Sequence, residues 1–351
     1  MDSRSEAVTR WVRQQSGFEQ ASLTPVSGDA SFRRYFRATA PSKSSDQLRA
    51  AIVMDAPPEH EDCRPFVAIA RHWRDAGVAV PLVLAQDLDQ GFLLLEDFGD
   101  DLMLSRLSDD NADQLYGGAM TELCRIQQAP DNPDYPLPPY SAALLDREMA
   151  LFPDWLVERH LGIQLSGLER AMLDTAFAML RESAMAQPEV NVHRDYHSRN
   201  LLVRPGTPVP GVLDFQDAVR GAVTYDLVSL LKDCYIRWPE SRLEQWIEQY
   251  RQLGLEAGVH HADPDTFRQW FELMGMQRHL KASGIFARLA IRDGKTRYLA
   301  DIPRTLGYLV EASGRQPALR QFHAWLREVV LPAMELKENA PPDRPRETLI
   351  P

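Results

Sequence analysis

Residues 193–200 read His-Arg-Asp-Tyr-His-Ser-Arg-Asn, and residues 212–215 read Val-Leu-Asp-Phe at the end of an apolar run. Asn200 follows Asp195 by five positions, and Asp214 follows Asp195 by nineteen. Mg²⁺ prefers oxygen ligands such as carboxylates and amides, whereas a carboxylate kept clear of the metal can accept a proton from an alcohol. The spacing therefore predicts that Asn200 and Asp214 bind Mg²⁺ and that Asp195 is a catalytic base.

The first segment has the form H-R-D-x-x-x-x-N, the pattern of the catalytic loop in kinase-like enzymes, and Asp214 stands where such enzymes carry D-F-G. A phosphoryl group in transfer spreads negative charge over its oxygens, so it needs positioned cations more than covalent help. Asp195 would orient the acceptor hydroxyl in line with the γ-phosphate of ATP. These residues predict an ATP- and Mg²⁺-dependent phosphotransferase. Taken alone, Asp214 also fits a residue that only caps the turn after a strand.

The same segment permits a second interpretation. His193, Asp195 and His197 alternate as H-x-D-x-H and would place three ligands on one side of a strand, as in a metal-dependent hydrolase. A further ligand set is hard to find, because the other histidines form no ligand motif apart from the adjacent pair His260-His261. The hydrolase therefore stands as an alternative of a different chemical class.

The composition is that of an ordinary globular protein. The chain has 351 residues, of which 44% are hydrophobic and 25% charged, and this length suffices for two lobes with separate cores. A formal net charge of -11 argues against general binding of nucleic acid or of an anionic membrane. The net charge allows a cationic or small-molecule substrate, and no obligate protein partner is inferred.

The cysteines and the first residues bear on the compartment. Cys63, Cys124 and Cys234 lie far apart without a C-x-x-C pair, so neither a disulfide framework nor a zinc ribbon is indicated. The first residues are polar and precede a short helix, which is not the pattern of a secretion signal. The longest apolar run, residues 78–85, contains a proline and is too short to span a bilayer. We therefore expect a cytoplasmic protein.

The hydrophobic period changes near Gly99. Before it the period is close to two, with one helix beginning near Pro65 and ending at Gly77, which predicts a small antiparallel sheet with one packed helix. The strands are expected around Phe32 and residues 35–36, 51–54, 82–85 and 92–95. After Gly99 a period near 3.6 predicts helices around residues 110–129, 141–161 (interrupted near Pro153), 166–185, 223–236, 241–256, 264–292, 301–313 and 317–331. The fold class is α+β, with a larger, mostly helical second lobe.

This change of period divides the chain into three parts. We expect an N-terminal nucleotide-binding lobe (residues 1–98), a C-terminal catalytic and substrate-binding lobe (residues 99–340) and a proline-rich tail (residues 341–351). A hinge is expected at residues 96–100, where a buried strand runs into a glycine and acids. Backbone groups from Glu96 to Phe98 suit the polar edge of adenine between two apolar walls, although a plain interdomain turn explains these residues equally well.

Together, the catalytic loop, the Asp-Phe pair, the hinge and the order of the lobes resemble the aminoglycoside phosphotransferase and choline kinase family, whose fold is a relative of the protein kinases. The resemblance covers nearly the whole chain and implies a protein-kinase-like two-lobed fold that uses ATP and Mg²⁺. Residues 27–36, 53–59 and 284–289 look like a narrower group, the bacterial kinases that phosphorylate the anomeric (C1) hydroxyl of N-acetylmuramate and N-acetylglucosamine in peptidoglycan recycling.

The resemblance implies roles for further residues. Ser27, Gly28 and Ser31 would form a turn over the ATP phosphates, to which backbone N–H groups and a hydroxyl donate. With a single glycine, this segment also fits a plain hairpin turn. His193 and Asp226 match positions that brace the catalytic loop through hydrogen bonds to backbone.

One departure from the family pattern concerns the phosphates. The strand at residues 50–55 lacks the lysine that kinase-like folds place there, and no glutamate partner follows in the helix at residues 64–76. The absence of both the lysine and its glutamate partner is physically consistent, because either residue alone would be an unpaired buried charge, which is costly. Arg33 and Arg34 lie on the adjacent strand, and since neighbours face opposite sides, one of them would point toward the cleft. Otherwise both are solvated edge residues.

The predicted helix at residues 264–292 carries a basic stripe in an acidic protein, with Arg278, His279, Lys281 and Arg288 as candidate substrate contacts. N-acetylmuramate has a lactyl carboxylate that a guanidinium can bind, whereas polycationic aminoglycosides prefer carboxylates. The stripe therefore favours a neutral or anionic sugar. A solvated helix face would show the same pattern.

Three functions follow from these observations. The first is an ATP-dependent kinase that acts on the anomeric hydroxyl of an amino sugar. The second is a kinase of another small alcohol or of an aminoglycoside. The third is a catalytically silent nucleotide-binding regulator, which only the missing lysine supports.

Overall fold

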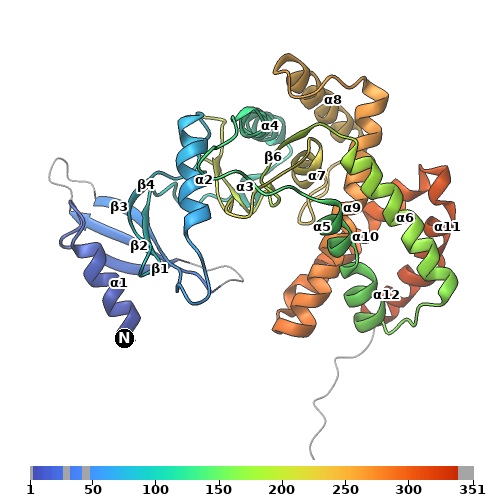
Figure 1. Cartoon of the computed structure of the whole chain (residues 1–351), viewed down its shortest axis with the longest axis horizontal. Coiled ribbons are helices and arrows are strands. Elements are labelled where there is room, and N and C mark those ends of the chain that lie inside the picture. Colours follow the sequence, from blue (N-terminus) through green and yellow to red (C-terminus); the bar gives the residue numbers. More distant parts are fainter. Residues whose placement is uncertain (1–2, 27–31, 42–47, 339–351) are drawn as a thin grey trace, which may run out of the picture. The chain divides into compact units, whose positions relative to one another are not determined.

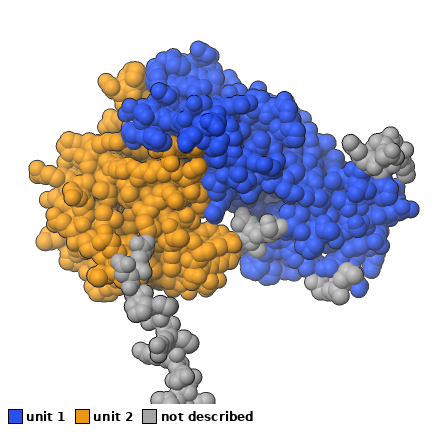
Figure 2. Space-filling view, turned by 180° about the vertical axis from the view of Figure 1, so that it is seen from behind, with its two compact units in different colours: residues 1–139, 188–231, 239–262 blue, residues 140–187, 232–238, 263–351 orange. Residues whose placement is uncertain are grey.

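The computed structural model describes residues 3–26, 32–41 and 48–338. The chain forms two compact units, which Figure 2 colours separately. Unit 1 comprises residues 1–139, 188–231 and 239–262, and unit 2 comprises residues 140–187, 232–238 and 263–351. Each unit has its own hydrophobic core.

Unit 1 contains a five-stranded antiparallel sheet in the order β1-β2-β3-β5-β4 (Figure 1). Helix α1 (Ser3–Arg13) packs Val8, Trp11 and Val12 into a core that also holds Val53 and Leu94 of the sheet. Between β3 and β4 lies helix α2 (Arg64–Asp75), with Pro65 in its first turn. The strands are β1 (Ser22–Val26), β2 (Arg34–Pro41), β3 (Leu48–Asp55), β4 (Val83–Asp87) and β5 (Phe92–Leu95).

The rest of unit 1 combines helices with two short antiparallel pairs of strands, β6 with β9 and β7 with β8. These pairs matter for the site, because the loops that join them carry the candidate catalytic residues. The elements are α3 (Met103–Arg106), α4 (Ala112–Gln128), β6 (Glu189–Val192), β7 (Leu201–Leu202), β8 (Gly211–Val212), β9 (Val219–Ala222), α7 (Tyr225–Leu231) and α8 (Glu240–Glu256).

Unit 2 is helical and is built around α9 (Pro264–Asp293). The Asp263 side chain caps its first turn, and Gly294 ends it in the left-handed conformation at φ +67°. Around it lie α5 (Ala142–Met149), the π-helix η1 (Phe152–His160), α6 (Gly167–Met185), the 3₁₀ helix η2 (Thr296–Asp301), α10 (Ile302–Gly314), the 3₁₀ helix η3 (Pro317–Leu319), α11 (Arg320–Trp325), the π-helix η4 (Leu326–Val330) and α12 (Leu331–Glu338).

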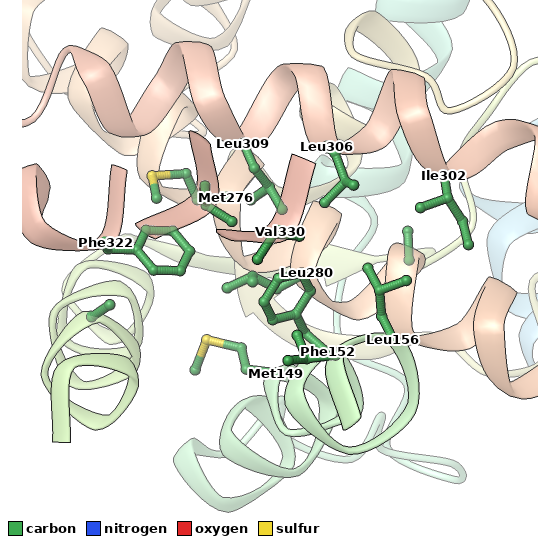
Figure 3. Close-up of a cluster of buried hydrophobic side chains, with 14 of the residues drawn as sticks. Met149, Phe152, Leu156, Met276, Leu280, Ile302, Leu306, Leu309, Phe322 and Val330 are labelled. Carbon is green, nitrogen blue, oxygen red and sulfur yellow. The ribbon is translucent and has the colours of Figure 1, made fainter. Parts of the chain in front are cut away.

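The core of unit 2 joins side chains from most of these helices (Figure 3). Phe152 and Leu156 of η1 meet Met276 and Leu280 of α9 and Leu306 of α10. Although α9 is the longest helix described, neither it nor any other helix in the described residues is both long and apolar enough to cross a membrane.

The α+β fold class predicted from the sequence is confirmed, but several predicted elements differ in detail. Phe32 is not in a strand, because β2 begins at Arg34, and its ring is 65% exposed. The interruption expected near Pro153 in the helix at 141–161 is present, because the segment is divided into α5 and the π-helix η1, which has Pro153 in its first turn. The helix expected at 223–236 ends at Leu231, and the one expected at 317–331 is divided among η3, α11 and η4. Strands β6 to β9 are too short, at two to four residues, for the hydrophobic period to predict them.

Candidate active site

The two predicted catalytic segments lie beside each other in unit 1. Residues 193–200 lead from β6 to β7, and residues 213–218 lead from β8 to β9. The Leu213 N–H donates to the carbonyl oxygen of Asn200 over 2.9 Å and so joins the two loops next to Asp214. Strand pairing therefore brings residues nineteen positions apart in the chain to one place.

Asn200 lies between the two aspartates. Its Nδ2 donates to the carbonyl oxygen of Asp195 over 3.0 Å and lies 3.5 Å from Oδ2 of Asp214. These contacts orient the amide with Nδ2 toward the two aspartates, so Oδ1 is the atom that a hard cation could use. Asp214 itself has φ +64°, a conformation that non-glycine residues seldom adopt, and its Oδ1 accepts a hydrogen bond of 2.9 Å from Gln216. The structure thus fixes both predicted metal ligands.

A buried imidazole connects the loop of Asp195 with the loop of Asp214. The Asp195 N–H donates to Nδ1 of His193 over 3.2 Å, so the ring proton is on Nε2, which donates to the carbonyl oxygen of Leu213 over 2.8 Å. Complete burial lowers the pKa of His193 and keeps the ring neutral, despite the opposing effect of Asp226. His193 therefore holds the backbone on both sides of the site.

Asp226 braces the same loop from α7. Its carboxylate accepts the backbone N–H of His193 over 2.6 Å and that of Arg194 over 3.0 Å. These bonds hold Arg194 at φ +78°, in the left-handed region. Burial raises the pKa of Asp226 to about 6, although the neighbouring His193 and the two N–H groups act against this rise. Asp226 is thus a structural residue of the loop.

These hydrogen bonds also bear on the hydrolase alternative. Both ring nitrogens of His193 are engaged, so this histidine cannot bind a metal without breaking the link between the loops. Within residues 3–26, 32–41 and 48–338, no group of three or more His, Cys, Asp or Glu side chains is arranged to hold a metal ion. The geometry therefore does not support a zinc-type centre at His193, Asp195 and His197.

The two arginines at the start of β2 have different partners. Arg33 donates from Nε and Nη2 to Oε2 of Glu61 over 3.1 and 3.0 Å, and its Nη1 lies 3.7 Å from Oδ1 of Asp214. Arg34 forms an ion pair of 2.6 Å with the buried carboxylate of Asp55. The structure thus brings Arg33, and not Arg34, to the predicted metal ligand.

Glu61 is a site residue that the sequence analysis missed. The glutamate partner was expected within the helix at residues 64–76, whereas Glu61 precedes that helix. The sequence did offer one signal for Glu61, namely an acidic residue shortly before the start of this helix. The predicted phosphate-turn residues Ser27, Gly28 and Ser31 lie outside the described residues.

The side chains of the predicted hinge have partners within unit 1. The Glu96 carboxylate binds Arg74 and accepts the N–H of Leu82 over 3.2 Å. The ring of Phe98 lies so close to Gly211 that a Cβ atom there would come within 2.4 Å of it. A nucleotide contact at this segment would therefore use the backbone rather than these two side chains.

Arg37 of β2 ties the sheet to the hinge. Its guanidinium donates to Asp97 over 2.6 Å and to Asp100 over 2.7 Å. The Asp97 carboxylate also accepts the N–H of Gly99 over 2.9 Å. Arg37 thus binds two carboxylates of the predicted hinge.

The candidate substrate residues lie on α9 in unit 2, and two of them are engaged with the segment that follows α7. Arg278 is buried and donates from Nη1 to Sγ of Cys234 over 3.6 Å. His279 is also buried. Its Nε2 donates to the carbonyl oxygen of Lys232 over 2.9 Å, and its ring stacks on Tyr308 at 4.7 Å between centroids. These residues are not part of a solvated helix face.

The other two candidates differ in their environment. Lys281 is buried and forms an ion pair of 3.1 Å with Glu148. Arg288 is only partly buried, and its Nε has no hydrogen-bond partner among the described residues. Burial and the nearby Arg292 lower the pKa of Arg288. Of the four residues, Arg288 is therefore the one best placed to attract an anion.

Comparison with known proteins agrees with this geometry. The sequence model of the phosphotransferase enzyme family matches residues 22–270. An N-acetylmuramate/N-acetylglucosamine kinase of Pseudomonas putida is 45% identical over 339 residues, which cover 93% of this chain and 97% of that protein.

Solved structures show the same fold at low sequence identity. An ethanolamine kinase of Plasmodium vivax superposes with a TM-score of 0.61 and 11% identity, over 86% of this chain and 84% of the other. An aminoglycoside phosphotransferase with ADP bound gives 0.57 and 13%, over 89% of this chain and 99% of the other. The chain belongs to the phosphotransferase enzyme family.

Proposed function

We propose that this enzyme transfers the γ-phosphoryl group of ATP to the anomeric hydroxyl of N-acetylmuramate and N-acetylglucosamine, in the cytoplasm and as part of peptidoglycan recycling. One observation carries the choice of sugars: the 45% identity, over nearly the full length of both chains, to a kinase named for these two substrates. The nucleotide is supported by the ADP bound to an aminoglycoside phosphotransferase of the same fold.

The donor set fits Mg²⁺. Asn200 would contribute Oδ1 and Asp214 a carboxylate oxygen, and a magnesium site needs only one or two such protein ligands besides phosphate and water. When bound at Asn200 and Asp214, Mg²⁺ would neutralise negative charge on the phosphates of the nucleotide. Gln216 and Asn200 both contact the Asp214 carboxylate and so orient it within this donor set.

Asp195 would act on the acceptor. Its backbone is fixed on both sides, because its N–H donates to His193 and its carbonyl oxygen accepts from the Asn200 side chain. A carboxylate held in this way can orient the sugar hydroxyl and accept its proton as the new P–O bond forms. Most of the catalysis then comes from positioning and from cations around the phosphates.

For the sugar we propose a contact with Arg288 of α9 rather than with Arg278, His279 or Lys281, which are buried and engaged with partners in unit 2. Arg288 is the least buried of these four residues and is therefore the most accessible to a ligand. Such a group gains from an incoming carboxylate, which N-acetylmuramate carries on its lactyl group.

Two other functions can be distinguished from this one by experiment. A kinase of another small alcohol or of an aminoglycoside would leave both amino sugars unphosphorylated. A catalytically silent regulator would bind nucleotide and yield no product, but the ordered arrangement of Asp195, Asn200 and Asp214 argues for chemistry.

The test is a reaction of the full chain with ATP, Mg²⁺ and a panel of sugars, followed by ³¹P NMR. The panel contains N-acetylmuramate, N-acetylglucosamine, their 1-O-methyl glycosides and an aminoglycoside. We expect an anomeric phosphate from the first two compounds and no product from the glycosides, whose anomeric oxygen is blocked. Phosphorylation of a methyl glycoside would contradict the choice of hydroxyl, and product from the aminoglycoside alone would contradict the choice of sugar.

A further inference from the structure

The segment before α2 runs beside the start of β2. The ring of Phe32 stacks on His60 with 4.5 Å between centroids, and the next residue along each segment forms the ion pair of Arg33 with Glu61. Two successive contacts therefore hold these short segments in register. The pair lies next to Asp214 and belongs to unit 1, as do both loops of the site.

Glu61 holds one edge of the Arg33 guanidinium, and Arg33 also forms a side-chain hydrogen bond with Tyr35. Its Nε and Nη2 both donate to a single oxygen of Glu61, and this geometry turns Nη1 toward Asp214, at 3.7 Å. The Arg33 side chain is 13% exposed and that of Glu61 is 17% exposed. Charges so far withdrawn from water interact more strongly and are screened less by salt than a surface pair.

We propose that Arg33 and Glu61 together do the work of the lysine and glutamate that kinase-like folds use to hold the nucleotide phosphates, with Glu61 as the positioning residue for Arg33. This role depends on the proposed function, since it needs a nucleotide at Asp214. Arg33 supplies a permanent positive charge beside the metal-binding carboxylate, where the terminal phosphates must come. It does so from the position just before β2, which explains why residues 50–55 need no lysine.

Glu61 has a second effect in this arrangement. A guanidinium and a carboxylate readily form a close, two-pronged pair. Without Glu61, Arg33 can close the remaining distance to Asp214 and compete with Mg²⁺ for that carboxylate. By engaging two N–H groups of Arg33, Glu61 keeps the arginine near Asp214 but not on it.

The chain offers a matched control on the same segment. Glu59 is exposed, two residues before Glu61, and carries the same charge. Glu59→Gln removes a negative charge from this segment without touching Arg33, and Glu61→Gln removes it from the pair. Because glutamine has nearly the shape of glutamate, both variants change charge with little change in volume.

Binding of Mg-ATP, Mg-ADP and adenosine to the wild-type chain and to both variants would be measured by isothermal titration calorimetry, with the Mg²⁺ concentration varied. We expect Glu61→Gln to weaken Mg-ATP binding about tenfold and to require more Mg²⁺, as the loss of one well-placed charge contact predicts. Adenosine binding should change less than twofold, and Glu59→Gln should match the wild type throughout. Arg33→Gln should lose at least as much Mg-ATP affinity as Glu61→Gln.

Two results would overturn this assignment: unchanged Mg-ATP affinity in Glu61→Gln, or an equal loss for adenosine, which would reveal a merely structural role. If Glu61→Gln does not fold, Arg33→Lys tests the proposal instead. Lysine keeps the positive charge but lacks the planar guanidinium with its several N–H donors. A Mg-ATP affinity in Arg33→Lys equal to that of the wild type would contradict the proposed role of the Arg33 guanidinium. Failure of the sugar assignment looks different, since the wild type would then bind Mg-ATP and show the same charge dependence, yet phosphorylate neither amino sugar.

Discussion

At the scale of single residues, the site works through a few side chains whose partners fix them in place. Asn200 takes its orientation from Asp195, and His193 binds the backbone of both catalytic loops. The hydrogen bonds of each of these side chains are compatible with a single orientation. Changes at the supporting residues should therefore affect turnover even where they do not touch the reactants.

His193→Phe tests this support. Phenylalanine fills the space of the imidazole but leaves the Asp195 N–H and the Leu213 carbonyl oxygen without partners. We expect kcat to fall by about 10-fold to 100-fold, because a small shift of a catalytic group is costly, with the affinity for Mg-ATP changed by less than about threefold. Steady-state kinetics and nucleotide titration would measure both. A kcat equal to that of the wild type would show that the link between the loops is dispensable.

Arg288→Gln tests the recognition of the sugar acid. Because only N-acetylmuramate carries a lactyl carboxylate, we expect KM for N-acetylmuramate to rise about tenfold and KM for N-acetylglucosamine to stay within about twofold, in line with the loss of one charge-assisted hydrogen bond. Arg292→Gln is the matched control, since Arg292 on the same helix is already paired with Asp293 at 2.7 Å. Equal effects on the two sugars, or equal effects of the two variants, would speak against a carboxylate contact at Arg288.

The residues of the site differ in how far the sequence reveals them. Asp195, Asn200 and Asp214 can be predicted because their spacing is set by the loops themselves. The choice between Arg33 and Arg34 could not be made, since strand alternation says that one faces the site but not which. Glu61 could not be paired with Arg33 because the contact joins segments 28 positions apart through tertiary packing.

At the scale of elements, the hydrophobic period identified the sheet and the longer helices but not the short strands. Helix α9 (Pro264–Asp293) matches the prediction of 264–292 because its caps, Asp263 and Gly294, are visible in the sequence. Strands β7 and β8, with two residues each, carry no such signal although they align the catalytic loops. The burial of Lys281 could not be predicted either, since Glu148, its partner, comes from α5.

Adjacent glycines in α4 provide a test of packing at this scale. A Cβ atom on Gly118 would lie 1.9 Å from the carbonyl oxygen of Pro208, in the connection between β7 and β8, whereas one on Gly117 would meet nothing closer than 3.8 Å. We expect Gly118→Ala to lower the free energy of unfolding by about 1–3 kcal/mol through overpacking. Gly117→Ala should raise it by about 0.5–1 kcal/mol, because alanine restricts the unfolded chain. Urea unfolding of both variants would measure this, and equal stability of Gly118→Ala and the wild type would contradict the close approach.

At the scale of the whole molecule, each unit has a core of its own, and unit 2 includes charged and titratable groups in its interior. Glu272 is buried and contacts Lys232 at 2.8 Å, Arg268 at 3.0 Å and Arg315 at 3.1 Å. Such networks are satisfied only in one arrangement of the helices. The stability of the chain should therefore respond to pH through buried groups of unit 2.

His279 determines the direction in which the stability changes with pH. Burial, helped by the cations Arg278 and Lys232, lowers the pKa of His279 to about 3. The native chain thus binds this proton less readily than the unfolded chain, whose histidine has a pKa near 6.5. The stabilisation is fully present above about pH 6.5 and is lost progressively as the pH falls toward 3, amounting to a loss on the order of 2 kcal/mol between pH 7.5 and 5.

Urea unfolding at pH 7.5 and 5 would measure this loss in the wild type and in His279→Phe. Phenylalanine retains the stack on Tyr308 but cannot titrate, so the difference between the two pH values should be smaller in the variant. An identical pH dependence in the two proteins would show that other groups control the acid sensitivity.

The central claim is that Asp195 acts on the sugar hydroxyl while Asn200 and Asp214 hold the metal and nucleotide. Asp195→Asn tests it most directly, with single-turnover transfer to N-acetylglucosamine and Mg-ATP affinity measured on the same preparation. We predict that transfer falls by about 10²-fold to 10⁴-fold, the usual contribution of a general base, and that Mg-ATP affinity stays within about threefold of the wild type. Transfer at the wild-type rate would contradict the claim.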